Sequence, residues 1–549
     1  MWRVRSIAAV VPGTILGLIL ATAPVRGGEA PSQVGKMVVP RQPGLTMTDQ
    51  PGGGGTARPA APDLYLVEKA EGGWLRVKTR RGAGWVAAEK MIAADDAVAF
   101  FSEAIAKNRR DAYAFAMRGK VLLFVRNDPT HAMDDANDAI EADPREPLGY
   151  AVRADIYFIR SDYDRAIADA SEVIRLRPGD ANALTARAGL YLVSQEPARA
   201  IADCNTALQA EPNNAGAYSV RASARLSGKD VAGAIADFSE AIRIDPNHLE
   251  SYVGRAMARS LIDDKDGAIA DYSRIIELEP TAAAAYQSRG AGWREKGDFN
   301  RALADFNAAV RLEPKNPAVY LSRALIRRER GDLTGALDDC ESAIALAPAS
   351  PNGYAIRAGL RAERREHDRS IDDFSRVIQL DPSNAWAYTN RGLAWFEKKD
   401  FDRALADLNR AVRLDPGNPS AYTSRGMVWH EKHEPEKALA DLSLASQLDP
   451  DSPDILNAEA WVRATSLDEK HRDGKLAVSL ARRAGELTEW KEPGILDTLA
   501  AACAEAGDFD DAIKWQTQAN ALFPNGPEKT EGEQRLKLYQ ARTAYHQAP

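Results

Sequence analysis

The chain has 549 residues, of which 45% are apolar and 27% are charged, and its formal net charge at pH 7 is −8. A single globular domain of this length would need several separate cores, so the length alone argues against one compact domain. The negative charges are spread along the chain, and a nucleic-acid partner would require a basic face. We therefore expect no binding to nucleic acid.

The first 23 residues have the composition of an export signal. A short cationic start contains Arg3 and Arg5, a mostly apolar stretch runs from Ile7 to Leu20, and residues 21–23 form a small-residue site of the cleavage type. A membrane anchor and a cytosolic N-terminal helix are the alternatives, and the short, Gly/Pro-interrupted stretch disfavours the anchor. We predict a signal peptide over residues 1–23, a periplasmic or cell-surface location, and no integral membrane span in the mature chain.

Residues 24–60 are rich in glycine and proline, which predicts a flexible segment with one strand at 37–39. Alternation of apolar and polar residues then predicts short strands over 64–67, 74–77 and 84–86.

The run GGWLRVKTRRGAGWV, followed by AEKMI, resembles the bacterial SH3-like small barrel, and we assign residues 34–93 to it. The resemblance implies that this domain could bind cell-wall peptide or glycan. Its two tryptophans, Trp74 and Trp85, are more typical of the core and rim of a small barrel than of a ligand site.

A single helix is predicted over residues 95–110, where Phe100, Ala104 and Ile105 imitate the second helix of a helical pair. After it, ten prolines recur at an interval of 34 residues without a slip. They are Pro144, Pro178, Pro212, Pro246, Pro280, Pro314, Pro348, Pro382, Pro416 and Pro450. This period is typical of a helix-turn-helix repeat that stacks on its neighbours because it cannot bury its apolar face alone.

One period, from Ala385, reads AWAYTNRGLAWFEKKDFDRALADLNRAVRLDP. Tyr388 and Gly392 lie at helical spacing on a first helix, and Ala404 and Leu408 lie on one face of a second. The site of Ala404 is small in every repeat, which predicts closely packed helices.

At these residues the chain resembles the tetratricopeptide repeat family. The resemblance covers residues 111–451 in ten regular units, with irregular units over 452–526 and a capping helix and tail over 527–549. It implies a mainly α fold, an α-α superhelix of about twelve repeats. The closing stretch RDGKLAVSLARRAGELTEW is similar to the last repeats of bacterial multidomain members, including some of planctomycete type.

An arginine and an aspartate each occur once per repeat. The arginines are Arg118, Arg153, Arg187, Arg221, Arg255, Arg289, Arg323, Arg357, Arg391 and Arg425, and the aspartates are Asp135, Asp169, Asp203, Asp237, Asp271, Asp305, Asp339, Asp373, Asp407 and Asp441. These arginines could form an anion-binding ladder. Pairing of each with a carboxylate is the favoured interpretation because buried charges in proteins are normally paired. For Arg289 the expected partner is Asp271 or Asp305.

In the family that the chain resembles, first-helix sites one and five residues after the aromatic position line a groove. The resemblance implies that the groove residues here include Thr185, Ser219, Val253, Gln287, Leu321, Leu325, Thr389, Leu393, Thr423 and Met427. The lysines and asparagines that clamp a terminal carboxylate in chaperone-binding members are absent from these sites, as is the asparagine ladder of sugar-transferase solenoids. An extended or helical protein segment with modest apolar side chains is the expected guest.

The sequence lacks a Gly-rich phosphate loop, a GxSxG elbow and a CxxC pair, so we predict that the protein is not an enzyme and has no cofactor. His430 and His433 could share a metal, but a metal site needs three or four ligands, and an exposed loop explains both histidines. Cys204, Cys340 and Cys503 occupy inward helical positions, and the first two lie four repeats apart. We therefore expect buried, unbridged thiols.

These patterns predict an exported, non-enzymatic scaffold that binds protein or peptide partners through the groove. One alternative is a cell-envelope attachment protein in which the SH3-like domain binds wall material. Another is the recognition subunit of a separate enzyme.

Overall fold

The computed structural model describes residues 33–60, 62–79 and 82–546. The predicted signal peptide, residues 1–23, lies outside these ranges. Internal contacts divide the chain into two compact units, one ending at Asp305 and the other beginning at Phe306. Within the described ranges, no helix has the length and apolar character needed to cross a membrane.

Seven strands form one antiparallel sheet in the order β3-β2-β6-β5-β4-β1-β7. Their bounds are β1 Met37–Pro40, β2 Thr46–Thr48, β3 Ala57–Pro59, β4 Tyr65–Glu71, β5 Trp74–Thr79, β6 Gly82–Ala87 and β7 Met91–Ala93, with short 3₁₀ turns η2 Pro51–Gly53 and η3 Ala88–Lys90. The three strands expected after residue 63 are confirmed by β4, β5 and β6, and the one at 37–39 by β1.

Beyond its predicted strand at 37–39, the flexible segment predicted over residues 24–60 is wrong for residues 45–59. Three strands and the η2 turn lie within it, and Val38, Val39, Leu45 and Met47 are buried in the sheet's core or against the helices that follow. The glycine and proline content predicted a flexible segment because ordering such a chain costs conformational entropy. Burial of these four apolar side chains offsets that cost.

Helix α1, Ala94–Lys107, confirms the predicted lead-in helix and packs against β1 and β7. Ala97 and Phe101 are its most deeply buried residues, while Phe100 is half-buried. The inward face is therefore shifted by one residue from the expected one.

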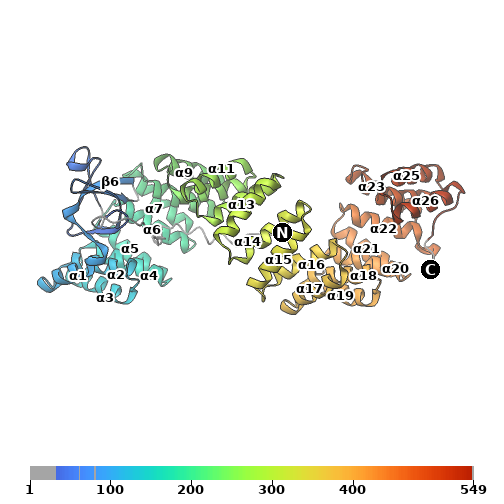
Figure 1. The fold of residues 1–549 in the computed structure, drawn as a ribbon, viewed down its shortest axis with the longest axis horizontal. Helices are drawn as coiled ribbons and strands as arrows, with labels where there is room; N and C mark the ends of the chain where they lie inside the picture. Colours follow the sequence, from blue (N-terminus) through green and yellow to red (C-terminus); the bar gives the residue numbers. More distant parts are fainter. Residues whose placement is uncertain (1–32, 61, 80–81, 547–549) are drawn as a thin grey trace. The chain divides into compact units, whose positions relative to one another are not determined.

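Ten pairs of helices follow, as the ten predicted repeats require (Figure 1). In the first unit they are α2 Ala112–Phe124, α3 Pro129–Ala142, α4 Pro147–Ile159, α5 Tyr163–Leu176, α6 Ala181–Val193, α7 Pro197–Ala210, α8 Ala215–Ser227, α9 Val231–Ile244, α10 Leu249–Leu261, α11 Lys265–Leu278 and α12 Ala283–Glu295. Helix α13, Phe299–Leu312, contains the division between the units. The second unit continues with α14 Pro317–Glu329, α15 Leu333–Leu346, α16 Pro351–Glu363, α17 His367–Leu380, α18 Ala385–Glu397, α19 Phe401–Leu414, α20 Pro419–Glu431 and α21 Pro435–Leu448.

Local chemistry sets the ends of these helices. An aspartate side chain accepts a hydrogen bond from the first turn of many second helices, as Asp264 does from the Gly267 amide at 2.9 Å. The turn between the two helices of a repeat passes through one residue with positive φ, usually not a glycine. These residues are Asn127, Ser161, Gln195, Lys229, Asp263, Gly297, Gly331, Arg365, Lys399 and His433.

The predicted small-residue site is buried in every repeat. Its alanines are 0 to 4% exposed, and Ser370, the one exception, donates its hydroxyl to the Ala358 carbonyl at 2.9 Å. A Cβ on Gly392 would lie 3.3 Å from the Ala404 carbonyl oxygen. The two helices of this repeat therefore pack as closely as the sequence predicts.

Beyond α21 the chain forms α22 Pro453–Thr465, the short turn η4 Glu469–His471, α23 Gly474–Leu487, α24 Pro493–Glu505, α25 Phe509–Leu522 and α26 Pro527–Gln540. The residues inserted near 467–474 form η4 and its flanks. Helix α26 packs on α25 and buries only Gly532, Arg535 and Tyr539, which is consistent with a polar cap.

Candidate protein-interaction surface

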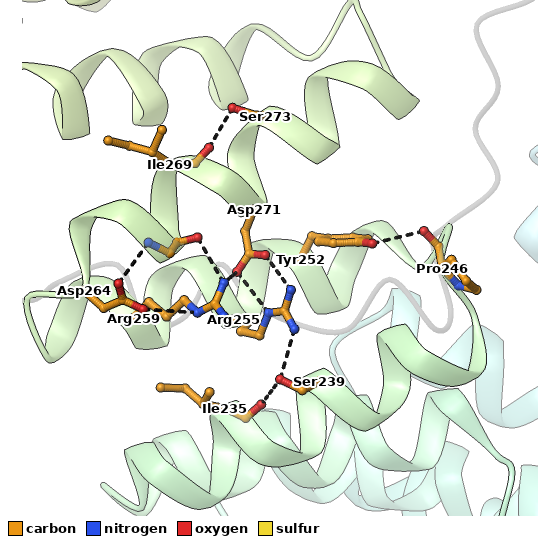
Figure 2. A network of polar contacts seen from close by, with 11 residues as sticks. Ile235, Ser239, Pro246, Tyr252, Arg255, Arg259, Asp264, Ile269, Asp271 and Ser273 are labelled. Atoms are coloured by element: carbon orange, nitrogen blue, oxygen red, sulfur yellow. Dashed lines mark hydrogen bonds and ion pairs between the residues drawn. The ribbon is translucent and has the colours of Figure 1, made fainter.

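The ladder arginines are paired, as the repeat around Arg255 illustrates (Figure 2). The Arg255 guanidinium donates from Nε to Asp271 Oδ2 at 3.0 Å and from Nη2 to Asp271 Oδ1 at 2.6 Å. Its third nitrogen, Nη1, donates to Ser239 Oγ at 3.0 Å. Arg259 adds a bond from Nη1 to Asp271 Oδ2 at 2.7 Å, so this carboxylate is fully engaged.

The same bidentate pair occurs in all ten regular repeats. Nε to Oδ2 distances are 2.7 to 3.0 Å, and Nη2 to Oδ1 distances are 2.6 to 2.8 Å. The predicted pairing is confirmed. The partner lies in the same repeat, 17 residues after Arg118 and 16 residues after each of the other arginines, so Arg289 binds Asp305. An anion-binding role would need guanidinium groups that are not already committed to carboxylates.

Nine of these ten arginines also donate a hydrogen bond from Nη1 to a serine or asparagine of the preceding helix. The Nη1 acceptors lie 16 residues earlier and are Ser102, Asn137, Ser171, Asn205, Ser239, Ser273, Asn307, Ser375 and Asn409. Arg357 instead lies 3.9 Å from the Glu341 carboxylate. This contact with the preceding helix was not predicted from the sequence, although nine repeats carry serine or asparagine at the acceptor site. One arginine therefore joins three helices.

The ladder ends where the regular repeats end. One period after Arg425 the chain carries Glu459, which is 5% exposed and accepts hydrogen bonds from Ser443 and Ser446, both at 2.8 Å. Arg463, one turn later, pairs with it at 2.7 Å. The charge at the ladder site is reversed, and the neighbouring side chains are changed to match it.

The three cysteines are buried and unbridged, as predicted. Burial raises the pKa of the Cys204 and Cys340 thiols to about 12 and that of Cys503 to about 11. Thiolate is the reactive form, so we expect a thiol reagent at pH 8 to label none of them in the folded protein and all three after denaturation. Rapid labelling of the native protein would contradict this expectation.

His430 and His433 differ in their surroundings. His430 is only 5% exposed, so the expectation that both histidines lie in an exposed loop is wrong for it. His433 occupies the positive-φ turn position and is exposed. In the part of the chain that the structure describes, no group of three or more His, Cys, Asp or Glu side chains is arranged to hold a metal ion.

Three of the predicted groove residues have almost no exposed surface. Thr185 is 6% exposed, and Ser219 and Thr389 are each 4% exposed. The hydroxyls of Thr185 and Thr389 donate to carbonyls of their own helices, at Ala181 and Ala385. A partner could touch these three side chains little, because a neighbouring helix already covers them.

The other predicted groove residues keep some exposure. Leu393 is 39% exposed, while the remaining six are half-buried, namely Val253, Gln287, Leu321, Leu325, Thr423 and Met427. The sequence pattern could not distinguish the buried groove residues from the partly exposed ones. Side-chain size does not explain the difference, because Thr423 is half-buried while Thr185 and Thr389 at the same repeat site are buried.

Trp386, which the sequence analysis did not single out, is 49% exposed and meets Phe374 edge-on with ring centroids 5.6 Å apart. It precedes Leu393 by seven residues, so both lie on one face of α18. Gly359, at the corresponding site of α16, has nothing within 4 Å of a Cβ placed on it. We name the stripes of α14, α16, α18 and α20 that carry Leu325, Gly359, Leu393 and Met427 the first-helix face; Leu393 is exposed, and the other three residues are half-buried.

Two family models described as tetratricopeptide repeat match the chain. One matches residues 395–463, and the other matches 152–215, 191–248, 294–351 and 358–419. No curated protein matches the sequence.

Solved structures with similar folds include yeast Tom70, at 18% identity and a TM-score of 0.39, over 78% of this chain and 96% of Tom70. The APC/C hetero-tetramer Cut9-Hcn1 is 14% identical, with a TM-score of 0.41, over 81% of this chain and 93% of that one. YrrB, described as a tetratricopeptide repeat protein with an unusual peptide-binding site, is 20% identical, with a TM-score of 0.29, over 34% and 97%.

Apart from residues 452–463, the family models fall within the segment where the 34-residue period and the helix pairs coincide. Sequence period, helix arrangement and family models therefore agree, and the chain contains a long run of tetratricopeptide repeats.

Proposed function

We propose that this protein is a non-enzymatic scaffold that binds protein or peptide segments on the first-helix face. The observation that carries the proposal is the exposure of apolar side chains there. Leu393 and Trp386 remain 39% and 49% exposed on one helix, α18, and the repeats on either side carry the polar Asn352 and Ser420 at the site of Trp386. Exposed apolar side chains grouped on one face mark interaction sites.

Selection from a random-peptide display library on the folded full-length protein tests this function. Leu393→Ser should reduce recovery of the enriched peptides. The matched control is Leu444→Ser, because Leu444 is a leucine of similar exposure, 37%, on the second helix α21. Failure to enrich any peptide, or an equal loss in both variants, would refute the proposed function.

We further propose export, on the basis of the cationic and apolar composition of residues 1–23. The mature chain should begin between Pro24 and Pro31. Mass spectrometry of native protein from cell fractions checks this, and an intact Met1 on wholly cytosolic protein would rule it out.

The SH3-like character of residues 34–93 and the bacterial type of the protein are also proposals. Seven antiparallel strands around a buried apolar cluster are compatible with a small barrel. Sedimentation of a purified 33–93 fragment with cell-wall material would test the attachment role that the resemblance implies. The fragment's own folding must be checked first by circular dichroism.

A further inference from the structure

The tail that follows α26, residues 541–546, lies on the next member of the series that defines the first-helix face. One period after Met427 the chain carries Trp461, in α22. The centroid of the Tyr545 ring lies 6.0 Å from that of the Trp461 ring, and the two planes are tilted by 39°. The tail therefore covers the site at which the series of the first-helix face reaches α22.

A buried arginine completes this aromatic contact. The Arg535 guanidinium carbon lies 5.5 Å from the centroid of each ring, Trp461 and Tyr545. Arg535 is 6% exposed, and its Nε donates to Asp497 Oδ1 at 3.0 Å. Because the carboxylate holds the guanidinium in place, an aromatic ring placed on Trp461 also meets a fixed cation.

The residues on either side of Tyr545 also contact the protein. Ala544 packs with Tyr545 against the apolar cluster built from α22 to α26. His546 Nε2 lies 2.8 Å from Glu505 Oε2, and Arg472 donates from Nε to the other Glu505 oxygen at 2.8 Å. Three consecutive side chains of the tail are therefore seated, and all three are half-buried.

Side chains, and not backbone hydrogen bonds, hold these three residues. In the part of the chain that the structure describes, the last backbone bond of the tail runs from the Thr543 amide to the Leu538 carbonyl, at 2.9 Å, and closes the end of α26. Segments with few buried contacts and no backbone ladder open at a low free-energy cost. Residues 544–546 can therefore leave their site while α26 stays folded.

The seated tail is next to the helices that would hold a partner. Helix α22, which carries Trp461, contacts α20, which carries Met427. Burial raises the pKa of the Tyr545 hydroxyl, the Arg535 cation opposes this rise, and the Glu431 carboxylate at the end of α20 adds to it. A partner segment that continued from α20 onto α22 would therefore meet the tail.

We infer that residues 541–546 are an intramolecular ligand of the first-helix face, and that a partner segment displaces them by placing its own aromatic side chain on Trp461. The seated Tyr545 and His546 show which chemistry the site accepts. It takes an aromatic ring beside the Arg535 cation, followed by a side chain that donates a hydrogen bond to Glu505. This inference rests on the proposed function and adds the regulation of the same face and the side chains of its partner.

Fluorescence anisotropy with a labelled peptide ARTAYH, the sequence of residues 541–546, tests the inference on the full-length protein. Tyr545→Ala with His546→Ala opens the site, and this opened variant should bind the peptide. The wild type should bind about tenfold more weakly, because a site open about one-tenth of the time shows an affinity lowered by that fraction. A peptide with alanine in place of tyrosine should bind neither protein.

Two further variants locate the binding. Trp461→Ala, added to the opened variant, should abolish it, because the ring that receives the tyrosine is gone. The matched control, Arg542→Ala with Thr543→Ala, changes two exposed tail residues and should bind the peptide as weakly as the wild type does. Amide hydrogen exchange in α22 and α24 should be the same in the opened variant and in the wild type.

A second measurement leaves the seated side chains unchanged. Thr543→Cys provides an exposed thiol for a fluorophore, while the three native cysteines are buried. Excess unlabelled ARTAYH should release the tail and lower the anisotropy of this fluorophore. The peptide with alanine in place of tyrosine should leave the anisotropy unchanged.

The outcomes separate this inference from the function beneath it. If ARTAYH binds the opened variant no better than the wild type, or fails to release the labelled tail, the tail is a fixed cap and the inference is wrong. If the opened variant loses protection in α22 or α24, release of the labelled tail alone decides. The display selection with Leu393→Ser tests the proposed function at α18. Enriched peptides that leave the labelled tail in place would uphold that function and refute the inference.

Discussion

Replacing Arg289 by leucine should lower the free energy of unfolding of its repeat by about 3 to 5 kcal/mol, the usual loss when one member of a buried ion pair is removed. Asp305 is 7% exposed in its side chain and would keep a charge without the guanidinium that holds both its oxygens at 2.7 and 2.9 Å. Amide hydrogen exchange in α12 and α13 measures the change locally, which suits a repeat array better than a single global transition.

The double variant Arg289→Leu with Asp305→Leu should recover much of this loss because no unpaired charge remains. Arg301→Leu is the control: its contact with Asp298 is exposed, at 3.4 Å, and such a pair contributes about 0 to 1 kcal/mol. The pairing account would be wrong if Arg289→Leu proved as mild as Arg301→Leu, or if the double variant were no more stable than the single one.

The ladder shows what a repeated sequence can predict. Ten arginines and ten aspartates with one period require a common geometry, so pairing followed from burial and charge alone. The sequence could not decide whether Arg289 pairs with Asp271 or with Asp305, because both aspartates occur with the same period. The packing of the two helices in the structure decides it. The same reasoning could have predicted the Ser273 contact of Arg289, at 3.0 Å. A buried hydroxyl without a partner costs less free energy than a buried charge without one, so the serine predicts a partner less strongly.

Other features depended on packing that a single chain segment does not reveal. Residues 37–59 have a loop-like composition, yet distant strands supply their hydrogen bonds, as the pairing of Val38 with Tyr65 shows. Thr185 and Leu393 were both assigned to one groove by position, and only the neighbouring helices make one buried and the other exposed. Local composition does not predict whether a side chain is covered in this way, because the helices and strands that cover it come from other parts of the chain.

The small-residue site gives the second large expected effect. Ala404→Leu should destabilise its repeat by about 1 to 3 kcal/mol, the usual range for overpacking. Ala404 is 0% exposed, and its carbonyl oxygen lies close enough to Gly392 that even a methyl group there would be 3.3 Å away. A leucine must push α18 and α19 apart. Since each repeat is held by its neighbours, protection should also fall in α17 and α20.

Hydrogen exchange across α17–α20 measures this spread, and tryptophan fluorescence gives a second reading because Trp395 and Trp429 pack against the cluster that contains Ala404. Ala406→Leu is the matched control, since Ala406 is exposed on the same helix and the added side chain meets solvent. If Ala404→Leu and Ala406→Leu unfold alike, the close approach of the two helices does not limit stability there. A loss confined to α19 would instead refute the dependence of one repeat on the next.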